Sequence, residues 1–349
     1  MKNVNIIVAG FGRVGRAFWK VVEDKRTACR ERYGLNLILR AVFKSDGGLF
    51  GDAPLFIGPF LADAPPGLQK SPDWKPGLRV QDIIGDLEPG VLVECTPTDL
   101  QTGEPGLSYL TAAFHQGWHA VAASKGALAL RFKEVTDLAR QNGVQLKFSG
   151  AAAAALPALD VGMRSLAGAD VLGIEGILNG TTNFILSRLG EGKDYEQALS
   201  EAQEKGIAEP DPALDIDGWD TACKLLLISN AVMGTDFSLG EIQVTGIRGI
   251  SQELVIKAVQ LGKAIKFMGK CTNNEPNSPK KIEVGLTLLD PSHPLYGVNR
   301  TTKGITFYTD TMGPVTVIGG KSDLVGTGAS LLKDIIGIYD DRSRFLSHD

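Results

Sequence analysis

A short segment of the sequence places one carboxylate and one amine among apolar residues at helical spacing. Between Trp219 and Met233, Asp220 and Lys224 are the only charged side chains, and apolar residues occur on every side of the expected helix. Residues four apart lie on one face of an α-helix, so the two groups can pair. Because a buried charge costs several kcal/mol, the pattern indicates a pair retained for chemistry such as proton transfer.

An ordinary ion pair explains the same two residues in another way. Asp217 can be the N-cap of this helix, and Asp220 and Lys224 can then be a plain pair in its first turns. A solvent-facing pair normally has other polar residues along its stripe, whereas Leu227 and Ala231 follow here. The sequence therefore favours the buried pair and leaves the surface pair open.

An acidic loop precedes this helix. It contains four carboxylates and two prolines that interrupt regular structure: Glu209, Asp211, Asp215, Asp217, Pro210 and Pro212. Such a loop can bind an ammonium group, so a substrate that carries an amine is expected.

A second lysine follows a predicted strand. Residues 119–123 form a short apolar run that leads into Ser124-Lys125-Gly126. In open α/β sheets the carboxyl ends of the strands face the ligand crevice, so Lys125 is a second candidate for catalysis. Two lysines at one site lower each other's pKa, as does burial, and this suits proton transfer near neutral pH.

Three glycines near the N-terminus indicate a nucleotide site. Gly10, Gly12 and Gly15 form the pattern G-x-G-x-x-G directly after the apolar run of residues 4–9 and at the start of a helix-like stretch. The first glycine permits a tight turn, the second lets the backbone approach a pyrophosphate, and the third allows close helix–strand packing. The helix N-terminus adds N–H groups for the phosphates. A glycine-rich turn without a ligand is the structural alternative.

The end of the second expected strand, residues 35–43, bears on the choice of dinucleotide. An NAD enzyme usually has Asp or Glu at this point for the ribose 2′-hydroxyl. This strand instead continues into Lys44, with Arg40 a few residues earlier, and cations suit a 2′-phosphate. NADP(H) is therefore favoured over NAD(H), although Asp46 keeps NAD(H) open and both cations can be solvated surface charges.

The candidate residues need a sheet to bring them together. Strand-like and helix-like segments alternate through the first half of the chain, which predicts an α/β fold with a parallel, doubly wound sheet. Residues 52–80, rich in Pro and Gly, are expected to be loops, and residues 329–338 predict a closing helix. The expected domains are a dinucleotide-binding domain, 1–149 completed by 321–349, and a substrate-binding domain, 150–320.

The composition is that of an ordinary globular protein. A chain of 349 residues is longer than usual for a domain with a single hydrophobic core. Its net charge of −4 does not indicate binding to nucleic acid or to an anionic membrane. The turn at Gly10 leaves no room for a signal peptide, and no apolar run approaches the ~18 residues of a membrane span, so a cytoplasmic location is expected. The cysteines and histidines do not have the spacing typical of a disulfide framework, a metal site or a nucleophilic triad. They are Cys29, Cys95, Cys223, Cys271, His115, His119, His293 and His348.

Taken in order, the motifs resemble those of the homoserine dehydrogenase family, in the short form without a C-terminal regulatory ACT domain. The resemblance covers nearly the whole chain. Its motifs are GFGRVG, ECTPT from Glu94 to Thr98, SKGALA around Lys125, ILNGTTNFIL from Ile177 to Leu186, AQEKGIAEPDPALDIDGWDTACKL from Ala202 to Leu225, HPL from His293 to Leu295, and GTGASLLKDI near the C-terminus. The NGTTN and acidic-loop motifs are far more specific than the glycine pattern.

The resemblance implies NAD(P)-dependent interconversion of L-homoserine and L-aspartate 4-semialdehyde, a step in threonine and methionine biosynthesis. By matching position it assigns substrate binding to Glu209, Asp215, Asp220 and Thr181. Lys224 would move the proton at the substrate hydroxyl, and Lys125 would orient the substrate or assist proton exchange. With Gly10 and Arg40 from the patterns above, the dinucleotide contacts would be Gly12, Val14, Gly15, Lys44, Thr96, Ser124 and Lys125.

The resemblance also implies an architecture and an assembly. A Rossmann doubly wound sheet would be completed by the C-terminal helix, and an α+β substrate domain would support a homodimer through its sheet. Ser124 departs from the family, in which Asn usually precedes the lysine. Many members also have a Glu and a glycine-rich turn that support a monovalent cation, where this chain has Phe148-Ser149-Gly150 and an alanine run. No metal ligand is therefore predicted, although backbone carbonyls can still hold sodium or potassium.

Two other functions stay open on the residues alone. A related oxidoreductase would reduce another amino-acid semialdehyde or hydroxy acid, and assays on a panel of substrates would distinguish it. A non-catalytic dinucleotide sensor would bind the cofactor without turnover, but it leaves the buried Asp220–Lys224 pair unexplained.

Overall fold

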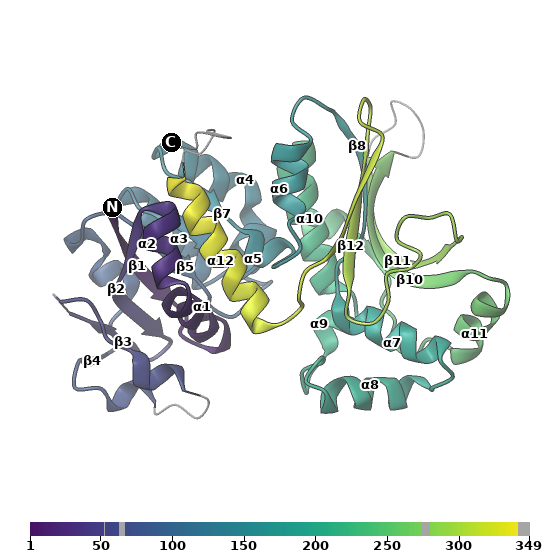
Figure 1. Cartoon of the computed structure of the whole chain (residues 1–349), viewed down its shortest axis with the longest axis horizontal. Helices are drawn as coiled ribbons and strands as arrows, with labels where there is room; N and C mark the ends of the chain where they lie inside the picture. The colour runs from purple at the N-terminus through teal and green to yellow at the C-terminus, as the bar shows by residue number, and fades with distance from the viewer. Residues whose placement is uncertain (52, 63–66, 274–279, 341–349) are drawn as a thin grey trace. The chain divides into compact units, whose positions relative to one another are not determined.

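The structure is a computed structural model of the whole chain, and it describes all residues except 52, 63–66, 274–279 and 341–349 (Figure 1). Contacts divide the chain into two compact units, Met1–Ala154 together with the chain from Asp323 onward, and Ala155–Ser322. Each unit has its own sheet, so the expected α/β fold class is confirmed. None of the helices in the described part of the chain combines the length and apolarity needed to cross a lipid bilayer.

The first unit is built on a seven-stranded, mainly parallel sheet. Its order is β4-β3-β2-β1-β5-β6-β7, and the five strands from β2 to β7 in this order run parallel. The chain moves outward from β1 in both directions, so the switch point of this sheet lies between β1 and β5, where open α/β sheets bind ligands. The strands are β1 (Lys2–Ala9), β2 (Leu35–Lys44), β3 (Gly47–Phe50), β4 (Trp74–Pro76), β5 (Val91–Glu94), β6 (His119–Ala122) and β7 (Leu146–Lys147).

Two antiparallel strands extend this sheet beyond β2. Ser45 and Asp46 form the turn between β2 and β3, with Lys44 opposite Gly47, and β4 then pairs with β3. The prediction of loops over residues 52–80 is therefore wrong at β4. A three-residue edge strand has no alternating pattern long enough to identify it in the sequence.

Helices cover both faces of the first sheet. On one face, α1 and the C-terminal helix α12 pack together around an apolar core that includes Phe18 and Ile335, while α3 contributes Ala113 to the core of the other face (Figure 1). The α1–α12 crossing is close because Gly328 has no side chain, and an added Cβ would collide with the backbone of Ala17 and Phe18. The helices of this unit are α1 (Arg13–Asp24), α2 (Arg26–Tyr33), α3 (Gly106–His115), α4 (Gly126–Gln141), α5 (Ser149–Ala152) and α12 (Leu324–Tyr339).

The second unit has a six-stranded sheet in the order β13-β12-β8-β10-β11-β9. Neighbouring strands are antiparallel except β11 and β9. The strands are β8 (Val171–Ile177), β9 (Gln243–Val244), β10 (Ala264–Asn273), β11 (Lys280–Leu289), β12 (Lys303–Thr309) and β13 (Pro314–Gly319).

One long helix packs across this second sheet and carries the acid–lysine pair. Helix α10 contacts β8, β10 and β11, and Gly269 of β10 permits this approach because an added Cβ would lie 3.1 Å from Leu225. The helices of the unit are α6 (Ala158–Asp160), α7 (Gly180–Gly190), α8 (Tyr195–Glu204), α9 (Ala213–Ile216), α10 (Trp219–Met233) and α11 (Gln252–Gln260).

Candidate active site

The start of α10 is defined by a glycine. Gly218 adopts a φ of 94°, and an added Cβ would lie 2.8 Å from the side chain of Val244, so only glycine fits at this position. Asp217 instead accepts hydrogen bonds from Arg248, at 2.9 and 2.8 Å. The interpretation of Asp217 as the N-cap is therefore wrong, because Gly218 occupies that position and no side chain among the described residues caps the helix.

The pair on α10 is mostly buried, as the sequence predicts. The Nζ of Lys224 donates to Oδ2 of Asp220 at 2.6 Å and to the carbonyl oxygen of Leu178 at 3.1 Å. The two charged side chains are 16% and 12% exposed. Within the described part of the chain no third acceptor contacts this nitrogen, so one of its tetrahedral directions is open to a ligand.

Asn179 joins the pair to the acidic loop. It is the N-cap of α7, where its side-chain oxygen accepts from the backbone N–H of Thr182 at 2.9 Å. Its Nδ2 donates to Asp215 at 2.7 Å and to Asp220 at 2.8 Å. The sequence analysis did not assign this residue, although Asn before a helix in the NGTTN motif was the available signal. A neutral amide thus holds two carboxylates beside one amine.

The carboxylate of Asp215 is perturbed by this environment. Burial raises its pKa, and the charge of Asp220 raises it further. The charge of Lys224 opposes the rise, as do hydrogen bonds from Asn179 and Thr181. Perturbed carboxylates with specific partners are frequent at functional sites.

The other acidic residues of the loop have separate contacts. Asp211 accepts from the backbone N–H of Ala213 at 3.1 Å, and Asp217 binds Arg248 as described above. Glu209 is exposed. Asp215 is hydrogen-bonded into the cluster with the α10 pair through Asn179.

The glycine turn of the first unit has the shape that a phosphate needs. Gly10 adopts a φ of 91°, and an added Cβ would lie 2.4 Å from the carbonyl oxygen of Cys95. A Cβ on Gly15 would lie 2.3 Å from the carbonyl oxygen of Gly10. Gly12 is different, since a Cβ there would meet nothing within 4 Å. Packing therefore requires the first and third glycines, and the second faces open space at the start of α1. Val14 follows in the first turn of that helix, half-buried.

The residues expected to distinguish a ribose 2′-phosphate from a 2′-hydroxyl include two at the end of β2. Lys44 is exposed at the last position of the strand. Asp46, in the following turn, accepts a hydrogen bond from Gln69 at 2.6 Å, which lowers the pKa of its carboxyl. This carboxylate is therefore engaged by a protein donor.

Arg40 lies at a bulge in β2. The register pairs Ile6 with Leu39 and the next residue, Ile7, with Ala41, so Arg40 is the extra residue. Its Nε is buried and has no hydrogen-bond partner among the described residues. Because an unmatched buried donor costs free energy, a ligand that supplies an acceptor is suited to this place.

The ends of β5 and β6 are joined by a buried carboxylate. Glu94, the last residue of β5, accepts hydrogen bonds from the hydroxyls of Thr96 and Ser124, the two residues assigned here from the resemblance. Lys125 follows, and its backbone N–H donates to the hydroxyl of Thr98 at 3.2 Å. These side chains lie at the carboxyl edge of the sheet, beside the switch point.

The segment Phe148-Ser149-Gly150, which departs from the family pattern, is hydrogen-bonded to the C-terminal helix α12. The backbone N–H and the hydroxyl of Ser149 donate to Asp334 at 2.9 and 2.8 Å, and Lys333 donates to the same hydroxyl at 2.9 Å. Among the described residues no group of three or more His, Cys, Asp or Glu side chains is arranged to hold a metal ion. Cys29, Cys95, Cys223 and Cys271 are free thiols.

Comparisons with known proteins agree with this geometry. The homoserine dehydrogenase family matches residues 157–336, and the NAD binding domain of homoserine dehydrogenase matches residues 10–149. The chain is 32% identical to the homoserine dehydrogenase of Methanocaldococcus jannaschii, over 98% of this chain and 100% of the relative. It is 30% identical to a protein of Pseudomonas canavaninivorans named NAD(+)-dependent homoserine dehydrogenase, over 100% of this chain and 99% of the relative.

A solved structure leads to the same family. The crystal structure of a homoserine dehydrogenase from Thiobacillus denitrificans matches with a TM-score of 0.80 at 25% identity, over 99% of this chain and 76% of that one. The resemblance found in the motifs is therefore confirmed by independent matches in sequence and fold. The chain belongs to the homoserine dehydrogenase family, whose members are NAD(P)-dependent oxidoreductases.

Proposed function

We propose that Lys224 moves the proton in the interconversion of L-homoserine and L-aspartate 4-semialdehyde. One observation carries this proposal. Two of the tetrahedral directions of its Nζ are occupied, by Asp220 at 2.6 Å and by the carbonyl oxygen of Leu178 at 3.1 Å, and the remaining direction has no acceptor among the described residues.

This geometry serves both directions of the reaction. As a neutral amine, Lys224 keeps its two N–H donors on Asp220 and Leu178, so its lone pair points along the open direction and accepts the hydroxyl proton of the alcohol. As an ammonium, it offers a third N–H along the same direction to the developing alkoxide. The bound dinucleotide supplies the hydride chemistry.

The charge of the cluster favours a substrate that carries an amine. Asp215 and Asp220 together exceed the single positive charge of Lys224, and their bridge, Asn179, is neutral. An ammonium group would balance this excess. The proposed substrate contacts are therefore the carboxylates of Asp215 and Asp220, together with Thr181 and the exposed Glu209.

The first unit is proposed to bind the dinucleotide across its switch point. The pyrophosphate would lie at the turn of Gly10, Gly12 and Gly15, over Gly12, where a Cβ would meet nothing within 4 Å, with Val14 beside it. Thr96, Ser124 and Lys125 would contact the half of the dinucleotide beside β5 and β6.

NADP(H) is the proposed preferred form. The 2′-phosphate would be bound by Lys44 at the end of β2 and by Arg40 at its bulge, while the carboxylate of Asp46 in the following turn is already bound by Gln69. The P. canavaninivorans relative is named NAD(+)-dependent, so the ratio of the two activities has to be measured.

Amine rescue tests the role of Lys224. The Lys224→Ala variant is expected to lose roughly 10³-fold in kcat for L-homoserine oxidation, since general acid–base groups contribute about 10²–10⁴-fold. Added methylamine or ethylamine should restore part of the rate, in an order that follows amine basicity. Equilibrium binding of NADP⁺ should change little. A variant with near-normal turnover, or one that no amine rescues, would contradict the assignment.

The assembly and location of the protein also remain proposals. A homodimer formed through the sheet of the second unit is expected from the family resemblance, and sedimentation equilibrium of the purified protein would show a mass of two chains. A cytoplasmic location is expected on the same basis.

A further inference from the structure

Glu94 is a buried carboxylate whose hydrogen-bonding capacity is fully used. It is 0% exposed at the carboxyl end of β5. The backbone N–H of Thr96 donates to its Oε1 at 2.7 Å, and the Thr96 hydroxyl donates to the same oxygen. The Ser124 hydroxyl donates to Oε2, and the backbone N–H of Ser124 also bonds to the carboxylate.

Burial and hydrogen bonding act in opposite directions on the pKa of Glu94. Burial has the larger effect and raises this pKa, while the hydrogen bonds from Ser124 and Thr96 limit the rise. The first residue of α3, Gly106, packs against the carboxyl group, where an added Cβ would lie 3.4 Å from the carboxyl carbon. A helix N-terminus stabilises negative charge. Two of the four donors are backbone N–H groups that cannot reverse their role, so a carboxylate that only accepts fits all four.

This arrangement sets the direction of two hydroxyl groups. A hydroxyl carries one hydrogen, and those of Thr96 and Ser124 are both directed at Glu94. Toward any other group the two oxygens can then only accept. Thr96 is half-buried, and Ser124 is buried with 6% of its surface exposed.

We propose that Glu94 is a positioning residue that turns Thr96 and Ser124 into hydrogen-bond acceptors for the primary amide of the nicotinamide ring. This inference rests on the proposed dinucleotide site. The two halves of a dinucleotide lie on opposite sides of the switch point, and the cations of β2 lie on one side. The nicotinamide half therefore lies beside β5 and β6, and its amide nitrogen offers two N–H donors that match two acceptors.

Binding of a dinucleotide analogue tests this inference. In the 3-acetylpyridine analogue of NADPH a methyl group replaces the amide nitrogen, so the carbonyl remains and both donors are lost. Calorimetry with the wild-type protein is expected to give roughly ten-fold tighter binding of NADPH than of the analogue. The ratio should fall toward one in Thr96→Val and Ser124→Ala, mainly through weaker NADPH binding.

The Glu94→Gln variant separates positioning from simple structural support. Its side-chain amide must donate toward at least one of the two hydroxyls, which frees that hydroxyl hydrogen to point outward. The NADPH preference should therefore fall in Glu94→Gln, but not below the ratio of the variant that carries both Thr96→Val and Ser124→Ala. Thr136→Val is a matched control in the same unit, because its hydroxyl donates only to backbone carbonyls of α4, and it should keep the wild-type ratio.

Several outcomes would overturn the inference. Equal weakening of NADPH and the analogue in Glu94→Gln would mean that the carboxylate only supports the fold. If Glu94→Gln fails to fold, Thr96→Val and Ser124→Ala still test the inference. An unchanged ratio of NADPH affinity to analogue affinity in these two variants would contradict it. A wild-type protein that binds both ligands equally would also overturn it, and would leave the role of Lys224 intact because amine rescue tests that role separately.

Discussion

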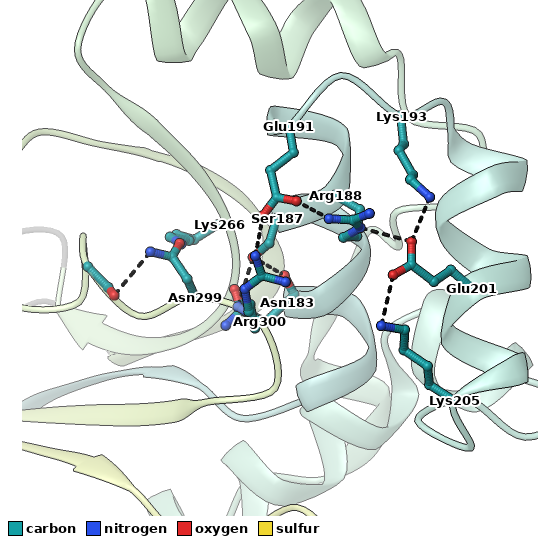
Figure 2. A network of polar contacts seen from close by, with 11 residues as sticks. Asn183, Ser187, Arg188, Glu191, Lys193, Glu201, Lys205, Lys266, Asn299 and Arg300 are labelled. Carbon is teal, nitrogen blue, oxygen red and sulfur yellow. Dashed lines mark hydrogen bonds and ion pairs between the residues drawn. The ribbon is translucent and has the colours of Figure 1, made fainter.

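Two acidic clusters in the second unit have opposite charge balance. Figure 2 shows Glu201 of α8 among three cations, with contacts to Arg188 at 2.9 Å, Lys193 at 2.8 Å and Lys205 at 3.2 Å. These cations lower the pKa of Glu201 to about 2. At α10 two carboxylates share one cation, and burial raises the pKa of Asp215. In the first cluster cations outnumber the carboxylate, whereas in the second the carboxylates outnumber the cation.

A count of ion pairs therefore does not locate a functional site. In the larger network, around Glu201, the carboxylate already has three cationic partners, and its lysines lie partly in solvent, where ion pairs contribute little. The smaller one is mostly buried and unbalanced, and a substrate ammonium would complete it.

The same chemical change in the two clusters should have opposite consequences. Asp220→Asn keeps the shape of the side chain and removes its charge, so Lys224 loses its counter-ion and the substrate amine loses a partner. We expect kcat/KM for L-homoserine to fall by about 100-fold or more. Glu201→Gln should leave kcat/KM within about two-fold and lower the melting temperature by a few degrees at most. Initial rates and thermal unfolding measure both, and equal losses of activity would remove the distinction.

A change at the bridge between the carboxylates sharpens the comparison. Asn179→Asp keeps a good N-cap for α7 but replaces two donated hydrogen bonds by a third negative charge. The pKa of Asp215 should rise further, so the acidic limb of the pH profile of kcat/KM should move to higher pH. At neutral pH we expect a loss of about ten-fold. Asn179→Ser caps the helix without added charge, and an identical shift in that variant would contradict the charge argument.

The first unit offers the reverse case, a local excess of positive charge. Lys44 lies near the carboxylate of Asp46, which Gln69 already binds, and the Nε of Arg40 has no hydrogen-bond partner among the described residues. Lys44→Ala should lower the preference for NADPH over NADH by about ten-fold in kcat/KM, chiefly through a higher KM for NADPH. Kinetics with both dinucleotides test this. An unchanged ratio would show that Lys44 is a solvated surface charge.

A buried lysine with only neutral partners gives a pH dependence of stability. Lys266 is 3% exposed, and its Nζ donates to the carbonyl oxygen of Val298 at 2.5 Å and to Asn299 at 2.6 Å (Figure 2). Burial lowers its pKa from 10.5 to about 8. Between these values the unfolded chain binds a proton that the native state does not, so the free energy of unfolding rises with pH, by up to about 3 kcal/mol.

Removal of the amine isolates this contribution. Lys266→Met should flatten the pH dependence between about pH 8 and about pH 10, because neither state of the variant titrates at this position. Denaturant unfolding of both proteins at the two pH values measures the difference. If the free energy of unfolding changes equally with pH in both proteins, Lys266 is not the group that titrates. Enzyme activity need not be measured in this test, because Lys266 lies outside the proposed site.

Much of this could be predicted because the signals were local in the sequence. The polarity of α10 identified Asp220 and Lys224 as a buried pair, and the spacing of Gly10, Gly12 and Gly15 identified the turn after β1. Each of these features is a repeat or a spacing within one helix or one turn, which local periodicity reports directly.

The features that were missed depend on contacts between distant segments. Asn179 and Asp215 are 36 residues apart, and their hydrogen bond exists because α7 and the acidic loop meet beside α10. Arg248 lies 31 residues from Asp217 and removes that carboxylate from the loop cluster. The short strand β4 was also missed, since only its pairing with β3 makes it a strand.

The sequence by itself determined the fold class, the family and the residue types available for chemistry, because periodicity and motif spacing act over short stretches of chain. Tertiary structure alone decided which charges are balanced. Glu201 and Asp215 are both carboxylates with a lysine within ten residues, Lys205 and Lys224, and nothing in their immediate sequence separates a pKa of about 2 from a raised one. Burial and the number of cations within hydrogen-bond distance set that difference, and both are properties of the packed chain.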